Sequence, residues 1–308
     1  MAALSVMYTR VFGRTSEGGN PCPVVLNADA LSTAQMQAMA AAFGCETAFV
    51  VAPQSADAAL RLRYFVPLHE MEMCVHATVG ALTVLVEQRH ITKSLVQVET
   101  PLGVLPLEWR REDGQLWVTV EQFPPTFFER QPGRQPIKEE VAAVLGVDAQ
   151  VIDERVGPIQ NVSVSRSKMM IPLQDVVTLD SLQPSQEQVR QLCERYATTG
   201  LYPFTLRTRS PQLQAEARQF PKNAGYLEDP ATGVAAAALA AYLIHAGANA
   251  PSEHGWQVLS VGQGDAMGQP SLMRAEVLVE GGMITRTRIT GQARILSEEQ
   301  RTIPAANS

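Results

Sequence analysis

The stretch GVAAAALAAYLIHA, residues 233–246, decides the fold, because it is apolar on every face of the helix that it predicts. Such a helix cannot lie on a protein surface and has to be surrounded by other parts of the chain. It is also too short to span a bilayer, which takes ~20 apolar residues. Residues 77–86 (ATVGALTVLV) show nearly the same pattern. The sequence therefore predicts two buried helices.

Segments around these helices recur in the same order about half a chain apart. The offsets between matching segments run from 151 to 156 residues, close to half of the 308-residue length. Several matched elements at one period indicate two copies of a single β-rich unit. The matched pairs are 26–31 with 177–182, 46–52 with 200–206, 60–66 with 213–220, and 76–86 with 232–242.

Each copy offers several short strands of alternating polarity and one fully apolar helix. A curled sheet that closes around its own helix satisfies this composition. We therefore predict an α+β fold of two similar halves, each a β-barrel-like curled sheet around a central helix. The first half is predicted at 1–118, with a returning C-terminal strand within 284–297 as its expected completion, and the second at 119–283. The active site is expected in the cleft between them.

Composition excludes several classes of partner. The chain carries 25 Lys and Arg against 31 Asp and Glu, a net charge of −6, which leaves no electrostatic footprint for nucleic acid or an anionic membrane. The N-terminus lacks the pattern of a signal peptide. Four cysteines without a CxxC pair favour reduced thiols and a cytoplasmic protein. His69 and His76 lack the spacing of a helical metal-binding pair, so no metal is expected.

Both predicted helices begin at a turn that can bind an anion. The first N–H groups of a helix have no intrahelical partner and carry partial positive charge. The turns at 73–76 and 229–233 are therefore candidate sites for a carboxylate or phosphate group. Two such helix starts facing each other would bind one small anionic metabolite. Asp229, which precedes Pro230, is expected to act as an N-cap for the second helix.

Three further side chains are candidates for chemistry near these turns. Glu46 precedes an apolar strand and is either a solvated surface group or a general base. His76 either packs at the helix start or binds substrate and relays a proton. Cys74 is either a small packing residue or a nucleophile favoured by the helix N-terminus. The glycine-rich segment 262–271 lacks the spacing of a phosphate loop or a dinucleotide fingerprint, so nucleotide binding is not expected.

Together these motifs resemble the phenazine-biosynthesis isomerase-like (PhzF-like) family, which has the diaminopimelate-epimerase-like fold. The matching pieces span most of the chain, and their combination is more specific than any one alone. They are residues 12–21, Cys45-Glu-Thr-Ala-Phe-Val50, 62–67 with Glu72, Cys74-Val-His-Ala-Thr78, Glu228-Asp-Pro-Ala-Thr-Gly233 and 263–271. The resemblance implies two similar halves with the site between them, and homodimers are common in the family.

The resemblance also implies a cofactor-free proton shift. Glu46 would be the acid/base, and His76 and Asp229 would hold the substrate and assist proton movement. The chain departs from the family pattern at Val75, where glycine is usual, and at Val234, where serine is usual. These departures predict a smaller and more apolar pocket. The remaining predicted substrate-binding residues are Cys74, Thr232 and Gly233.

The related epimerases use one cysteine from each half. Cys74 resembles the first, but Thr232 stands at the second position, and a hydroxyl does not ionise near pH 7. We therefore predict a cofactor-independent isomerase that moves a proton between carbons of a small carboxylate-bearing metabolite. A racemase, epimerase or dehydratase of an amino or imino acid is one alternative. A non-catalytic small-molecule binding protein is another.

Overall fold

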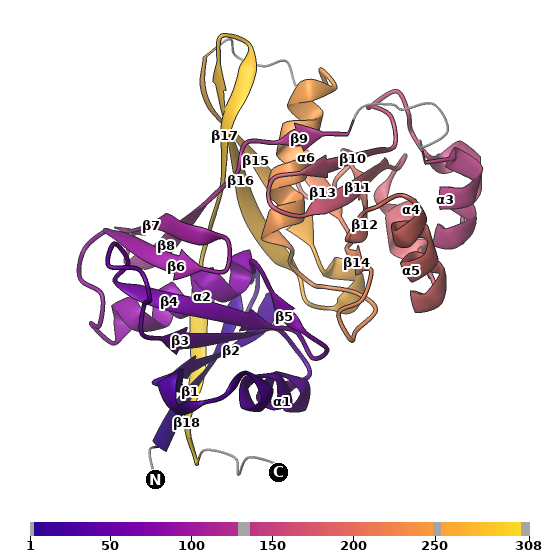
Figure 1. Cartoon of the computed structure of the whole chain (residues 1–308). Helices are drawn as coiled ribbons and strands as arrows, with labels where there is room; N and C mark the ends of the chain where they lie inside the picture. The colour runs from indigo at the N-terminus through magenta and orange to yellow at the C-terminus, as the bar shows by residue number, and fades with distance from the viewer. Residues whose placement is uncertain (1–2, 129–135, 249–253, 303–308) are drawn as a thin grey trace. The chain divides into compact units, whose positions relative to one another are not determined.

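The computed structural model describes residues 3–128, 136–248 and 254–302. They form a mixed α and β structure in which curled sheet predominates and helices are few (Figure 1). Contacts between residues divide the chain into two compact units. Unit 1 comprises Met1–Glu121 and Thr290–Ser308, and unit 2 comprises Gln122–Ile289. Each unit is described below by itself.

In unit 1 the strands pair in the order β18-β1-β2-β3-β4-β6-β7-β8. The β2–β3 and β4–β6 pairs are parallel and the others antiparallel, while the short β5 pairs with β4. The strands are β1 (Ala3–Val11), β2 (Asn20–Leu26), β3 (Thr47–Val51), β4 (Leu60–Phe65), β5 (Glu70–Met71), β6 (Leu95–Thr100), β7 (Gly103–Glu112), β8 (Gln115–Gln122) and β18 (Ala293–Thr302).

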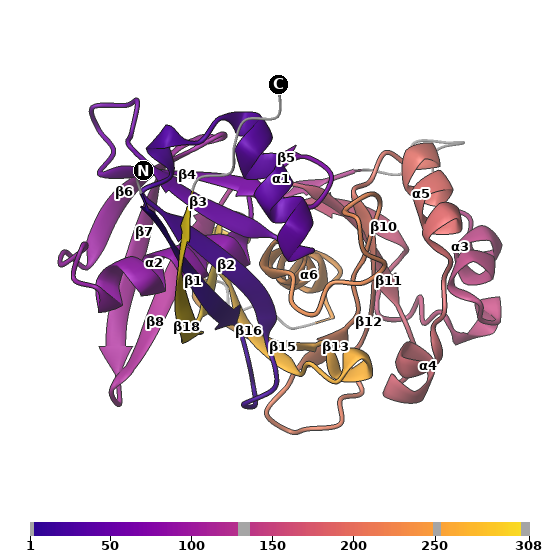
Figure 2. The same cartoon turned by 90° about the horizontal axis from the view of Figure 1, so that it is seen from below.

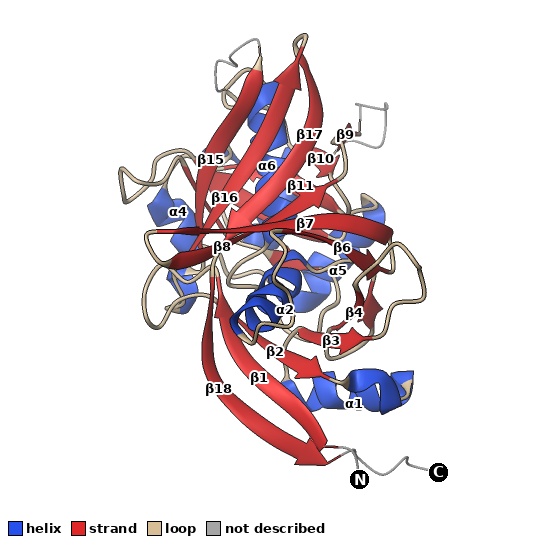
Figure 3. Ribbon diagram, turned by 90° about the vertical axis from the view of Figure 1, so that its left-hand side faces the viewer, coloured by secondary structure: helices blue, strands red, loops and turns tan. Residues whose placement is uncertain are grey.

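The central helix of unit 1 is α2 (Val75–Glu87), and every residue of it from Val75 to Val86 is buried. It packs against β1, β2, β3 and β18, so the sheet surrounds it (Figure 3). The buried helix predicted near 77–86 is confirmed. Residues 75–86 carry no Asp, Glu, Lys or Arg on any face, which is why the sheet can cover this part of the helix on all sides.

A second helix of unit 1, α1 (Thr33–Phe43), directly precedes β3 in the chain. The short η1 (Ala28–Ala30) leads to α1. Ser32 and Gln35 form a capping box at its start. The helix ends at Gly44, whose φ of 71° is readily reached without a Cβ. Because β3 begins at Thr47, the end of α1 determines where Cys45 and Glu46 lie.

In unit 2 the strands pair in the order β9-β10-β11-β12-β13-β15-β16, with β14 beside β12. The β11–β12 and β13–β15 pairs are parallel and the others antiparallel. The strands are β9 (Thr126–Phe127), β10 (Gln160–Ser163), β11 (Ser167–Pro172), β12 (Gly200–Thr205), β13 (Ala215–Ala217), β14 (Phe220–Pro221), β15 (Gly255–Gln263), β16 (Ser271–Glu280) and β17 (Met283–Gly291).

The central helix of unit 2 is α6 (Gly233–His245), which is buried from Gly233 to Leu243. It packs against β10, β11, β15 and β16, and Figure 2 shows it nearly end-on among these strands. The buried helix predicted at 233–246 is therefore confirmed. No helix within the described ranges is long and apolar enough to cross a membrane.

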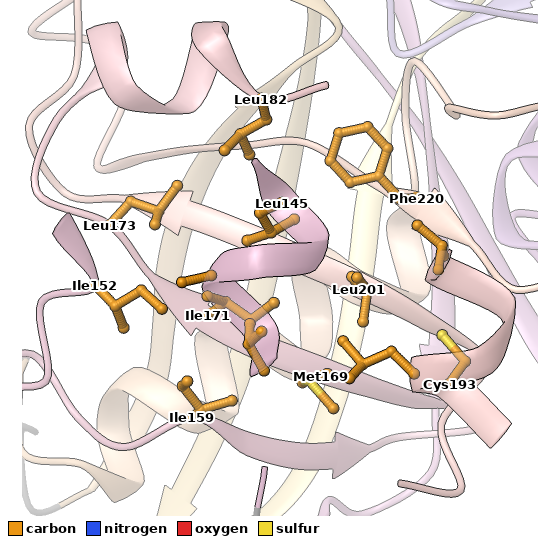
Figure 4. Close-up of a cluster of buried hydrophobic side chains, with 14 of the residues drawn as sticks. Leu145, Ile152, Ile159, Met169, Ile171, Leu173, Leu182, Cys193, Leu201 and Phe220 are labelled. Carbon is orange, nitrogen blue, oxygen red and sulfur yellow. The ribbon is translucent and has the colours of Figure 1, made fainter. Parts of the chain in front are cut away.

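The opposite face of the unit 2 sheet is covered by α3 (Lys138–Leu145), η2 (Ala149–Val151), α4 (Val176–Ser181) and α5 (Gln186–Arg195). Their apolar side chains join those of β11, β12 and β14 in one buried cluster (Figure 4). Leu201 and Phe220 belong to this cluster. Because side chains alternate along a strand, the neighbouring residues Gly200, Tyr202 and Gln219 face the other side of the sheet.

Two segments of the predicted repeat differ in form between the units. Residues 177–182, matched with 26–31, lie largely in helix α4, which is capped by the side chain of Asp175 through a hydrogen bond from Thr178 N. Residues 213–220, matched with 60–66, contain two separate short strands, β13 and β14, whereas 60–65 form the single strand β4.

The returning strand expected within 284–297 is divided between β17 and β18 at Gln292. The Gln292 carbonyl accepts a hydrogen bond from the backbone N–H of Phe12, at 2.8 Å. The Phe12 ring lies against Gly291, where an added Cβ would come within 2.1 Å of it. This bond adjoins the antiparallel pairing of β1 with β18, in which Val11 lies opposite Ala293.

Candidate active site

The candidate base, Glu46, lies in unit 1 at the point where the chain enters β3. Gly44 ends α1, and only Cys45 separates it from Glu46. The Glu46 residue is 6% exposed, so the reading of it as a solvated surface group is wrong. A carboxylate in such a position is held close to its neighbours and is shielded from bulk water.

His76, the second residue of α2, faces this carboxylate. Its Nε2 lies 3.9 Å from Glu46 Oε2, and the imidazole is buried. On the other side of the ring, Asn20 Nδ2 lies 3.4 Å from His76 Nδ1. If the amide donates to Nδ1, the ring proton of neutral His76 resides on Nε2. That tautomer directs an N–H group toward Glu46.

Cys74 completes this group of polar side chains. It is the N-cap residue of α2, and its Sγ lies 3.5 Å from His76 Nδ1 and 3.7 Å from Nε2. Its carbonyl accepts a hydrogen bond from the Thr78 hydroxyl at 2.8 Å, and that hydroxyl also contacts the Tyr64 hydroxyl at 2.7 Å. These bonds hold the first turn of α2 in place.

Burial sets the protonation of the groups around Glu46. Burial lowers the pKa of His76, and the nearby Glu46 carboxylate opposes that shift. Burial, reinforced by Glu46, raises the pKa of Cys45 to about 12. The pKa of Cys22 lies well above its ordinary value for the same main reason. Near pH 7 these groups are a neutral imidazole and two protonated thiols.

The start of α6 in unit 2 gathers the second set of predicted residues. Thr232 is the N-cap of α6, so the prediction that Asp229 acts as the N-cap is wrong. Instead the Asp229 carboxylate accepts a hydrogen bond from the Thr232 hydroxyl. Pro230 and Ala231 separate Asp229 from Thr232, so Asp229 lies beside the cap rather than in it. Both Gly233 and Val234 are buried in the first turn of the helix.

Gln263, which the sequence did not single out as a functional residue, organises this turn. Its Nε2 donates to the Asp229 carbonyl at 2.6 Å and to Thr232 Oγ1 at 3.1 Å. Its Oε1 accepts from the Thr232 N–H at 3.3 Å and from the Tyr202 hydroxyl at 3.0 Å. The motif that contains Gln263 was visible in the sequence, but its contact with the second helix start depends on the pairing of β13 with β15.

The structure therefore places the predicted residues in two groups. The first group lies in unit 1 and consists of Glu46, Cys74, Val75 and His76. Val75 is the first residue of α2 and is buried. Asp229, Thr232, Gly233 and Val234 lie together in unit 2. Among the described residues, no three His, Cys, Asp or Glu side chains are arranged to hold a metal ion.

Sequence reasoning also missed two arginines that hold the chain leading to each helix start. Arg63 forms a two-pronged ion pair with Glu70, and Arg218 forms one with Glu228. The available signal was an arginine two residues before the aligned Phe65 and Phe220. Asn20 was noticed only as part of a motif, and its contact with His76 required the fold.

Comparison with known proteins finds similarity along most of the chain. The family model described as phenazine biosynthesis-like protein (PhzC-PhzF) matches residues 9–299. The uncharacterized isomerase YfhB of Bacillus subtilis is 30% identical over 303 residues, covering 96% of this chain and 99% of that protein. The trans-2,3-dihydro-3-hydroxyanthranilate isomerase of Pseudomonas aeruginosa is 28% identical, covering 91% of this chain and 92% of that protein.

Solved structures show the same fold. A Bacillus anthracis phenazine biosynthesis protein of the PhzF family superimposes with a TM-score of 0.86 and 28% identity, covering 98% of this chain and all of that one. A probable proline racemase from Agrobacterium radiobacter superimposes with a TM-score of 0.67 at 12% identity, covering 99% and 94% of the two chains. The latter likeness concerns the fold alone.

Proposed function

The chain belongs to the phenazine biosynthesis-like protein family, whose curated relatives are named isomerases, and from this premise we propose a specific reaction. The protein moves a proton between two carbons of a small carboxylate-bearing metabolite without a cofactor. The observation that carries the proposal is the buried Glu46 carboxylate facing His76 Nε2 at 3.9 Å. The substrate class comes from the predicted anion sites at the helix starts.

In the proposed reaction, Glu46 accepts a proton from a carbon atom of the substrate. The C–H bond breaks, an O–H bond forms on the carboxyl group, and the electron pair delocalises into the adjacent double bond and carboxylate. The same carboxyl group then returns the proton to a different carbon, which restores Glu46. Neutral His76 donates a hydrogen bond that stabilises the developing negative charge, as do the N–H groups at a helix start.

Unit 2 supports a mechanism with one principal base. Its helix start carries the Thr232 hydroxyl where unit 1 carries the Cys74 thiol, since both residues are N-caps of the central helices. A hydroxyl does not ionise near pH 7, so a pair of thiols is not present to invert a stereocentre. We propose that Asp229, held by Thr232, binds a polar group of the substrate.

We further propose that the two units are copies of one ancestral unit. The order of pairing supports this: β2, β3, β4, β6 and β7 are joined by parallel, antiparallel, parallel and antiparallel pairs. The strands β11, β12, β13, β15 and β16 are joined in the same order. The central helix follows the equivalent strand in each case, and this common plan explains the 151–156-residue period.

The substitution Glu46→Gln tests the proposed function. Wild-type protein is incubated in D2O with a panel of small unsaturated and amino carboxylates, and deuterium uptake is followed by mass spectrometry. We expect uptake with at least one compound, and a loss of about 10²- to 10⁴-fold in Glu46→Gln, the usual contribution of a general base. Glu99→Gln is the matched control, because Glu99 is a second unit 1 carboxylate that bonds to backbone N–H groups.

The products distinguish the proposal from its alternatives. A double-bond shift supports the isomerase, whereas exchange at one carbon with inversion would indicate a racemase or epimerase. The contact between Cys74 Sγ and His76 Nδ1 at 3.5 Å is the observation that favours this alternative. Cys74→Ser would then abolish the inversion. Loss of water would indicate a dehydratase, and no exchange with any compound would favour a binding protein.

A further inference from the structure

Unit 1 contains a cavity of about 340 Å³ that is lined by three arginines. None of the residues in its lining belongs to the Glu46 cluster. It lies where the β1–β2 loop meets the first residues of β8 and β18. Its size is at the lower end of the range for small-molecule sites. No acidic residue lines it. The lining residues are Arg10, Gly13, Arg14, Thr15, Ser16, Gly18, Gln115, Gln292, Ala293 and Arg294.

Two of these guanidinium groups are held in position by backbone carbonyls. Arg10 Nη1 donates to the carbonyls of Glu17 at 3.0 Å and Gly19 at 3.4 Å. Arg294 Nη2 donates to the carbonyl of Ser16. Neither Arg10 nor Arg294 forms an ion pair within the part of the chain that the structure describes. Their positive charges are therefore balanced by no carboxylate among the described residues.

The loop that forms the cavity has a tightly determined backbone. A Cβ added at Gly13 would lie 2.7 Å from the carbonyl oxygen of Gly18, so only glycine permits this approach. Gly19 has a φ of 98°, and a Cβ there would lie 2.8 Å from the Val11 carbonyl oxygen. The backbone at Gly13 and Gly19 therefore follows a path that a residue with a side chain could not take.

We propose that this cavity binds a tetrahedral dianion, namely a phosphate group. A guanidinium group carries five N–H donors, and the carbonyl bonds of Arg10 and Arg294 use only some of them. Arginine forks match the geometry of phosphate oxygens, and the Thr15 and Ser16 hydroxyls lie in the same lining. The two guanidinium groups that lack an ion pair among the described residues, those of Arg10 and Arg294, together suit a dianion better than a single carboxylate. Their positive charge favours an anion at this site even though the whole chain carries a net charge of −6.

The same loop leads directly to the candidate catalytic cluster. Arg10 bonds to the carbonyl of Gly19, and the next residue, Asn20, contacts His76 Nδ1 at 3.4 Å. A phosphate group that draws the Arg10 guanidinium toward itself changes the bond that holds Gly19. The proposed site is therefore placed to adjust the position of Asn20 and, through it, the hydrogen bonding of His76. This gives the site a regulatory role.

Isothermal titration calorimetry of the full chain with sodium phosphate tests the site, with sodium chloride at equal ionic strength as the blank. We expect saturable binding to wild-type protein and at least tenfold weaker binding to Arg10→Gln and to Arg294→Gln. Arg110→Gln is the control for loss of charge, because Arg110 is a surface arginine of unit 1 paired with Glu112. Absence of saturable heat with wild type, or equal weakening by Arg110→Gln, overturns the proposal.

Further arms identify the source of the phosphate and guard against misfolded variants. Tighter binding of glycerol 3-phosphate than of inorganic phosphate indicates a phosphorylated metabolite, and equal binding indicates free phosphate; both support the site. Arg294→Lys keeps the charge but lacks the fork, so it should bind with intermediate affinity. The NMR signals of the His76 ring should move on addition of phosphate, and their failure to move overturns the regulatory role. None of these readouts requires isomerase activity.

Discussion

Arg63 in unit 1 and Arg218 in unit 2 make the same contacts in different surroundings. Arg63 donates two bonds to Glu70, both of 2.7 Å, and Arg218 donates two bonds to Glu228, of 2.8 and 2.7 Å. Each guanidinium also lies over the phenylalanine two residues later, at 5.2 Å from the ring centre in unit 1 and 4.9 Å in unit 2. The two ion pairs occupy equivalent places in the proposed duplication.

The difference between them is burial. The side chains of Arg63 and Glu70 are 16% and 32% exposed, whereas those of Arg218 and Glu228 are both 10% exposed. Arg218 Nη1 additionally donates to three carbonyls, those of Leu179, Asp180 and Leu182. Arg218 thus links the end of α4 to the residue that precedes Asp229. The chain entering α6 is held more firmly than the chain entering α2.

The largest expected effect is on the buried pair. Arg218→Met should lower the free energy of unfolding by about 3 kcal/mol, because it leaves the Glu228 carboxylate buried without its partner. Arg63→Met should cost only about 1 kcal/mol, since water reaches Glu70. Urea denaturation of the two variants and the wild type measures both values. Equal losses in the two variants would show that burial does not distinguish these pairs.

A second comparison concerns the residues before β3 and at the start of β12. Glu46 occupies this position in unit 1 and Gly200 in unit 2, according to the matched segments. A Cβ added at Gly200 would lie 2.3 Å from Gln219 Nε2 and 2.9 Å from the Phe220 carbonyl oxygen. Gln219 is 1% exposed, and neither of its side-chain polar atoms has a hydrogen-bond partner among the described residues. Where unit 1 has the Glu46 side chain, unit 2 therefore has Gly200, and the buried amide of Gln219 lies beside it.

Gly200→Ala should therefore destabilise the protein by about 2 kcal/mol through overpacking. The double variant Gly200→Ala/Gln219→Ala should recover part of this loss, because the side-chain clash disappears while the approach to the Phe220 carbonyl remains. Thermal unfolding of both variants beside Gln219→Ala alone gives the coupling energy. Strict additivity of the two single changes would mean that Gln219 does not fill the space beside Gly200.

The smallest expected effect is the pH dependence that His76 confers. Burial lowers the pKa of folded His76 below its ordinary value of 6.5. As the pH falls below about 6.5, the unfolded chain binds a proton at this residue before the folded protein does. The free energy of unfolding should therefore decrease between pH 7 and pH 5 as this residue titrates in the unfolded chain. The contribution of neutral His76 to the free energy of unfolding is fully present above pH 6.5 and is lost as the pH falls.

Urea denaturation at several pH values between 5 and 8 measures this dependence. His76→Gln should flatten the profile over that range, whereas His90→Gln should not, because His90 is exposed in the same unit. A profile that stays equally steep in His76→Gln would contradict the assignment of the titration to this residue.

The sequence by itself determined the two central helices and the make-up of the unit 1 cluster. Residues 77–86 and 233–246 are apolar on every face, so burial was the only stable arrangement for them. Cys74 and His76 are two residues apart at a helix start, which brings them into contact through local geometry. Glu46 was identifiable as a candidate because it stands between a helix end and an apolar strand.

Tertiary structure alone decided the contacts between distant segments. The role of Asp229 depends on where α6 begins, and that start is fixed by Gln263 from β15 rather than by the local motif. Asn20 reaches His76 only because β2 and α2 pack together. The arginine cavity joins the β1–β2 loop to a distant segment, with Arg294 lying 278 positions after Ser16, because β1 pairs with β18. Hydrophobic periodicity records which face is buried, whereas polar partners across a sheet depend on register, which no single segment encodes.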